Sequence, residues 1–85
     1  MPIFFFHFHD GVERLADPEG AELTFPQARA RALTEARALI AHDVLKGIVD
    51  LRQWIEIEEA DGTLFRTLSF SDAVEIRGLR PTVDL

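Results

Sequence analysis

The segment from Thr24 to about Lys46 constrains the fold most, because it carries the start and stop signals of a long helix. Thr24 and Gln27 have the spacing of a capping box, and Pro26 falls in the first turn, where its missing N–H costs nothing. The interior is rich in Ala, Leu and Arg, which are strong helix formers. Gly47 can adopt the left-handed conformation that commonly ends a helix. We therefore predict one long helix here.

One side of this predicted helix is apolar and rich in alanine. Spacing at about 100° per residue separates this side from the charged residues Arg31, Glu35 and Arg37. Small side chains let a helix lie close to its support, which suits a helix that crosses a sheet. We predict that the buried stripe consists of Phe25, Ala28, Ala32, Ala36, Leu39 and Ile40.

Residues 3–9 have the composition of a β-strand with apolar residues on both faces. One face carries Ile3, Phe5, His7 and His9, and the other carries Phe4, Phe6 and Phe8. Turns are expected at Asp10-Gly11 and at Asp17-Pro18-Glu19-Gly20. Residues 12–16 could form a short return strand, and residues 21–23 a brief extended piece.

Asp61-Gly62 lies between two alternating segments, which is a strong indication of a β-hairpin over residues 53–70. Two registers are compatible with this turn. A two-residue loop pairs Ile57 with Arg66 and Ile55 with Leu68, whereas a three-residue loop with a bulge pairs Glu56 with Arg66 and Ile57 with Phe65. Both registers place Ile55 and Ile57 on one face and Trp54, Glu56 and Glu58 on the other. Ser71-Asp72 could begin a single further helical turn.

These elements predict an α+β fold, in which a small antiparallel sheet of three to four strands carries one long helix packed on one face. At 85 residues the chain has the length of one domain, which we place at residues 1–76, with residues 77–85 as a C-terminal tail. There is no cysteine, which excludes disulfides, thiolate metal sites and a cysteine nucleophile. The first apolar run is short and lacks a preceding basic region, so we expect a cytoplasmic protein with no membrane association.

A single helix covers only one face of such a sheet, and the other face would lack a second layer. We expect Phe4, Phe6, Phe8 and Trp54 on this uncovered face. Exposed aromatic area of this kind usually marks a protein–protein contact. The hypothesis is that the chain is a homo-oligomer that associates through these four residues, with another protein as a possible partner.

His7 and His9 are the sharpest candidates for a metal site, because residues two apart on a strand project from the same face. Asp10 or His42 could supply a third ligand. The competing interpretation, which we favour, is a pair of half-buried histidines at a sheet end, since a closed zinc site needs about four ligands. Likewise, we expect the acidic residues Glu56, Glu58, Glu59 and Asp61 to form the solvent-facing side of an edge strand rather than an acid–base pair.

The net charge of −6 disfavours nucleic acid as a direct ligand, although the patch of Arg29, Arg31 and Arg37 keeps that alternative open. The sequence contains no serine nucleophile elbow and no glycine-rich phosphate loop. We therefore expect neither enzymatic activity nor a cofactor.

Several of these features together resemble a known family. They are the aromatic segment 5–8, the Asp10-Gly11 and Asp17–Gly20 turns, the alanines four apart in the helix, Trp54, the Asp61-Gly62 hairpin and residues 68–73. The chain resembles, over roughly residues 2–76, a family of small bacterial proteins catalogued as domain of unknown function 6894. That family implies no activity and no catalytic residues.

A looser likeness is to the antitoxin halves of HicA–HicB toxin pairs, which share the order strand, glycine-containing turn and alanine-spaced helix. The sequence thus supports a non-enzymatic interaction module as the first hypothesis. The alternatives are a metal- or small-ligand-binding protein that uses His7 and His9, and an antitoxin-like partner of a neighbouring protein.

Overall fold

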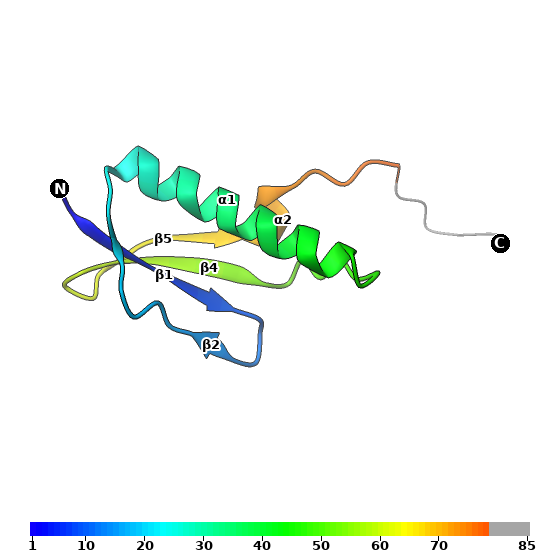
Figure 1. Ribbon diagram of the computed structural model, residues 1–85, viewed down its shortest axis with the longest axis horizontal. Coiled ribbons are helices and arrows are strands. Elements are labelled where there is room, and N and C mark those ends of the chain that lie inside the picture. Colours follow the sequence, from blue (N-terminus) through cyan, green and yellow to red (C-terminus); the bar gives the residue numbers. More distant parts are fainter. Residues whose placement is uncertain (79–85) are drawn as a thin grey trace.

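The computed structural model of the chain describes residues 1–78 and shows a helix lying along one face of an antiparallel sheet (Figure 1). The fold is therefore α+β, as predicted, but the sheet has five strands because both short segments pair with the first strand. The elements are β1 (Ile3–His9), β2 (Arg14–Leu15), β3 (Ala21–Glu22), α1 (Phe25–Val44), β4 (Trp54–Glu59), β5 (Leu64–Ser69) and α2 (Phe70–Ala73).

The two long strands β1 and β4 form the centre of the sheet, in the order β2-β1-β4-β5. The outer edge of β1 is shared: β2 pairs with its C-terminal end and β3 with its N-terminal end. The opposite edge of the sheet is β5, which pairs only with β4 among residues 1–78. One edge of the sheet therefore consists of the two short strands β2 and β3, and the other edge is the longer strand β5.

The predicted helix and its caps are confirmed. The Thr24 hydroxyl accepts a hydrogen bond from the Gln27 N–H at 3.3 Å, and the Gln27 side-chain oxygen accepts one from the Thr24 N–H at 2.9 Å. This reciprocal pair satisfies two backbone donors that a helix start leaves free. After the helix, Gly47 adopts a φ of +80°, the left-handed conformation expected there.

The core lies between α1 and the face of the sheet that carries Phe4, Phe6, Ile55 and Ile57. The alanine side of the helix packs closely against it, and Ala28, Ala32, Ala36 and Ile40 are buried. The stripe prediction is wrong at two of its six positions, because Phe25 and Leu39 remain partly exposed.

The structure corrects the predicted location of three phenylalanines. Residues directly opposite each other in a sheet share a face, and Phe6 pairs with Ile57 and Phe8 with Ile55. Phe4, which has the same parity, has no exposed surface, and Phe8 packs against the core. Phe4, Phe6 and Phe8 therefore lie under the helix, and the prediction that they share an uncovered face with Trp54 is wrong.

The body of the β4–β5 hairpin follows the first of the two registers, with Ile57 opposite Arg66 and Ile55 opposite Leu68. A bulge between Ile57 and Glu58 then shifts the pairing, so that Glu58 lies opposite Leu64. The extra residue at this bulge is Phe65. The hairpin thus combines the pairing of one predicted register with the bulge of the other.

The position of β4 corrects a second prediction. Because β4 is paired on both sides, Glu56 and Glu58 do not belong to an edge strand. Both side chains are only partly exposed, and they lie among the side chains of β1 and β2. Strand order depends on contacts between distant segments, which explains why alternation within β4 could not predict it.

The single helical turn after β5 exists but begins earlier than expected. Its N-cap is Ser69, whose hydroxyl accepts a hydrogen bond from the Ser71 N–H at 3.3 Å. Arg37 Nε donates to the Ala73 carbonyl at 2.8 Å and so ties α2 to α1. Most of the predicted tail, residues 79–85, lies outside the described residues. Among residues 1–78, no helix has the length and apolarity needed to cross a membrane.

Candidate functional site

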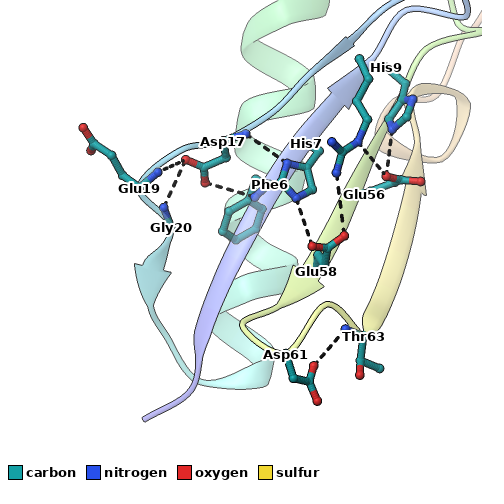
Figure 2. A network of polar contacts seen from close by, with 11 residues as sticks. Phe6, His7, His9, Asp17, Glu19, Gly20, Glu56, Glu58, Asp61 and Thr63 are labelled. Carbon is teal, nitrogen blue, oxygen red and sulfur yellow. Dashed lines mark hydrogen bonds and ion pairs between the residues drawn. The ribbon is translucent and has the colours of Figure 1, made fainter.

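The sheet face opposite α1 carries a connected group of polar side chains from β1, β2 and β4, shown in Figure 2. We call this group the open-face network. Its members are His7, His9, Arg14, Glu56 and Glu58. The side chains come from neighbouring strands because β4 and β2 flank β1, so that alternate residues of all three strands project to one side.

His9 and Glu56 form the closest contact of the network. His9 Nε2 lies 2.8 Å from Glu56 Oε1, and both side chains are largely shielded from solvent. The imidazole ring also stacks on the indole of Trp54, with ring centroids 4.7 Å apart and an interplanar angle of 11°. His9 is therefore held between a carboxylate and an aromatic ring at the end of the sheet.

His7 is buried and is oriented by the loop that follows β2. The Asp17 N–H donates a hydrogen bond to His7 Nδ1 at 3.0 Å. Because Nδ1 accepts, neutral His7 carries its proton on Nε2. That atom is shielded from solvent and lies 3.7 Å from Glu58 Oε1, which is beyond hydrogen-bonding distance. A small movement of the Glu58 side chain would supply the missing acceptor.

Arg14 connects the two halves of the network. Its guanidinium lies 3.6 Å from Glu56 and 3.8 Å from Glu58. The contact with His9 is the largest of the effects that hold the pKa of Glu56 below its ordinary value; desolvation opposes the shift, and Arg14 adds to it. Arg14 therefore lies beside both carboxylates of the network.

Asp17 anchors the loop that closes the edge of β1 between β2 and β3. Its carboxylate accepts hydrogen bonds from the N–H groups of Phe6, Glu19 and Gly20 at 3.1 to 3.2 Å (Figure 2). Desolvation raises the pKa of Asp17, but these three donors outweigh it, and the net pKa is lowered. The Asp17 side chain therefore supplies a hydrogen-bond acceptor to the β1 backbone at Phe6, between the parts of β1 that pair with β2 and β3.

Gly20 allows this loop to lie close to β1. Its φ is +71°, and a Cβ at this position would come within 2.9 Å of the Phe5 ring and 3.1 Å of the Phe4 carbonyl oxygen. Any larger residue would push the loop away from the strand. The predicted Asp-Pro-Glu-Gly turn thus also orients His7, through the hydrogen bond from the Asp17 N–H.

The candidate metal ligands are not brought together. His7 and His9 share a face, as predicted, but His7 Nδ1 is occupied by the Asp17 N–H. Asp10 instead accepts the N–H groups of Val12 and Glu13 at 2.8 and 2.7 Å in the turn after β1. His42 lies on α1, across the sheet from the histidine pair. Within residues 1–78, no three His, Cys, Asp or Glu side chains form a group that could hold a metal ion.

Two residues of the site escaped sequence analysis. Arg14 was placed only within a possible return strand, and Asp17 only within a turn. The indication for Asp17 was available, because an Asx turn leaves one carboxylate oxygen free for a distant donor. No local pattern could show that the donor is Phe6, eleven residues away.

The comparison with known families gives one match. The sequence model of the family described as Domain of unknown function (DUF6894) matches residues 3–71, which span β1 to the first residues of α2. The chain therefore belongs to this family. A search of the curated proteins found no match, and a search of the solved structures found none either.

Proposed function

We propose that this chain is a small non-enzymatic interaction module that self-associates through the open face of its sheet. The observation that carries the proposal is the open-face network, whose charged groups are already paired with one another. Burying an unpaired charge at an interface is costly, whereas burying charges that bring their partners costs less. A face of this kind can be covered by a second copy without leaving an isolated charge.

Apolar side chains beside the network provide area for such a contact. Trp54 and Phe5 are partly exposed and stack on His9 and His7, and Leu64 is 53% exposed directly opposite Glu58. Interfaces commonly combine a buried aromatic anchor with surrounding polar pairs. The open face has both parts, although its aromatic members differ from the phenylalanines expected from the sequence.

A second copy suits this face because the network carries both signs of charge. In a two-fold dimer the same surface meets itself, so each cation needs a carboxylate on the same patch of the other copy. Arg14 and Glu58 meet this condition, since they lie side by side on the face. A surface of one sign would repel its own copy.

The experiment compares two double variants by light scattering after size exclusion, over a range of protein concentrations. Trp54→Glu with Leu64→Glu adds charge to the open face, and we expect a monomer with unchanged helix content. Leu45→Glu with Val49→Glu adds the same charge outside the face, where both residues are exposed. This control should associate like the wild type.

Two results would contradict the proposal. A wild-type protein that remains monomeric at every concentration would exclude self-association. A Trp54→Glu, Leu64→Glu protein that still forms the oligomer would place the interface elsewhere. Circular dichroism of both variants separates either result from a loss of folding.

A further inference from the structure

A second surface lies on the other side of the molecule, where the start of α1 meets β5. It is a hollow of about 210 Å³ lined by Phe25, Pro26, Arg29, Phe65 and Arg66. The rings of Phe25 and Phe65 form its apolar wall, with centroids 5.0 Å apart. Phe25 is 49% exposed although it stands at the start of the buried stripe of α1. We call this surface the Arg–Phe groove.

The bulge in β5 builds this groove. In a regular strand, Phe65 and Arg66 would project to opposite faces of the sheet. The register shift between Ile57 and Glu58 inserts one extra residue in β5, and both side chains then line the same hollow. The guanidinium carbon of Arg66 lies 5.5 Å from the centre of the Phe65 ring, a cation–π distance that keeps the charge beside the aromatic wall.

The groove differs in charge from the rest of the chain. The protein carries a net charge of −6, yet the lining contains two arginines and no carboxylate. Within the described part of the chain, neither Arg29 nor Arg66 forms an ion pair, whereas Arg14, Arg31, Arg52 and Arg77 all do. Two guanidinium groups at an aromatic wall favour an occupant that combines a carboxylate with an apolar group.

The position of the groove favours a peptide as this occupant. It opens beside β5, whose outer edge pairs with no strand in residues 1–78. The exposed backbone of an edge strand can bind an extended segment of another protein, and a pocket next to it can select the side chains of that segment. A nucleic acid carries a negative charge on every nucleotide and would meet the net negative charge of the remaining surface over its whole length, whereas a peptide segment needs only one or two carboxylates at the two arginines.

We propose that the Arg–Phe groove binds an extended acidic peptide segment of a partner protein. An apolar side chain of the segment enters between Phe25 and Phe65, and an adjacent carboxylate pairs with Arg29 and Arg66. This site is separate from the open face and does not depend on self-association there.

The test is an NMR titration of the ¹⁵N-labelled full chain with the peptide acetyl-Ser-Asp-Phe-Glu-Val-Asp-Ser-amide. We expect the amide signals of Phe25, Arg29, Phe65 and Arg66 to shift in a saturable way at up to millimolar peptide. The matched peptide in which Asn and Gln replace Asp and Glu should bind about tenfold more weakly, because it lacks the carboxylates. Equal binding of both peptides, or shifts that lie away from the groove, would overturn the proposal.

A pair of charge-matched variants completes the test. Arg29→Glu with Arg66→Glu should weaken binding of the acidic peptide about tenfold or more. Arg52→Glu with Arg77→Glu makes the same change in net charge at exposed sites outside the groove and should weaken it much less. Equal losses of peptide affinity in the two variants would show that only the net charge of the protein matters, and would contradict binding at the groove. If the amide chemical shifts of the groove residues change with protein concentration in the absence of peptide, a second copy of the chain is the occupant and the peptide proposal is wrong.

Discussion

The two faces of the central strands differ sharply, although the same two strands, β1 and β4, supply both. Toward α1, β1 and β4 contribute Phe4, Phe6 and the two isoleucines of the core, which are buried. Away from α1, the intervening positions contribute histidines and glutamates that lie next to one another. Every second residue therefore belongs to the core, and its neighbour belongs to the open face of the sheet.

This difference assigns separate tasks to the two faces. Burial of apolar surface is the dominant stabilising contribution to folding, whereas partly exposed ion pairs contribute little. The covered face should therefore determine stability, and the open face should determine what the protein contacts. Substitutions that compare neighbouring positions of opposite parity can test this assignment.

The largest effect is expected for Phe4→Ala. Phe4 packs against Phe25 and Phe65 with ring centroids 5.4 and 5.3 Å away. Removing a fully buried ring should lower the free energy of unfolding by about 3–5 kcal/mol. Ile3→Ala, one residue away on the exposed side, should cost less than about 1 kcal/mol. Urea denaturation measures both values, and similar losses at the two positions would remove the distinction between the faces.

Asp17→Ala tests the hydrogen bonds of the Asp17 carboxylate, on which we expect the stability of the fold to depend. The substitution leaves three backbone donors without their acceptor, and that of Phe6 is partly buried. We expect a loss of about 2–3 kcal/mol in the free energy of unfolding. Glu19→Ala is the control, because the Glu19 side chain points away from the network in Figure 2. A loss below that of the control would show that the loop does not brace the sheet.

The pH dependence of stability should reveal the same carboxylate. Desolvation opposes the charged form of Asp17, but the backbone donors prevail, so its pKa lies below the unfolded value of about 3.9. Its contribution is therefore fully present above that value and is lost as the pH falls through the folded pKa. Asp17→Asn should reduce the rise in unfolding free energy between acid and neutral pH. A slope identical to that of the wild type would contradict this account.

The smallest effect on folding is expected for Arg14→Ala. The Arg14 side chain is partly exposed, and its contacts with Glu56 and Glu58 are 3.6 and 3.8 Å long. The free energy of unfolding should change by less than about 1 kcal/mol. Arg52→Ala, which removes an exposed pair with Asp50, provides the comparison. A loss as large as that of Phe4→Ala would mean that the open face also holds the fold together.

Local patterns were sufficient to predict much of the fold. The capping box at Thr24, the left-handed Gly47 that follows the helix and the Asp61-Gly62 hairpin all depend on residues close in sequence. The shared face of His7 and His9 follows from strand alternation alone. These features require no knowledge of which segments meet in the folded chain.

The choice of the covered face required long-range information. Segment 3–9 is apolar at both parities, so alternation within it leaves two solutions. Comparison of the two strands indicates which face is covered. Ile55 and Ile57 mark the core face of β4, and the face of β1 with the two histidines is less apolar than the face with Phe4, Phe6 and Phe8. Strand order, the Asp17 hydrogen bonds and the bulge at Phe65 depend on pairing between distant segments, which periodicity does not encode.

The most direct test of the open-face contact uses Trp54, the only tryptophan of the chain. Its indole lies on the open face beside His9, so its emission reports whether that face becomes covered. The measurement is the emission maximum of the wild-type protein as a function of concentration, with the oligomeric state measured on the same samples. We predict a blue shift that follows oligomer formation. An oligomer that forms without any change in Trp54 emission, or no oligomer at any concentration, would contradict the account.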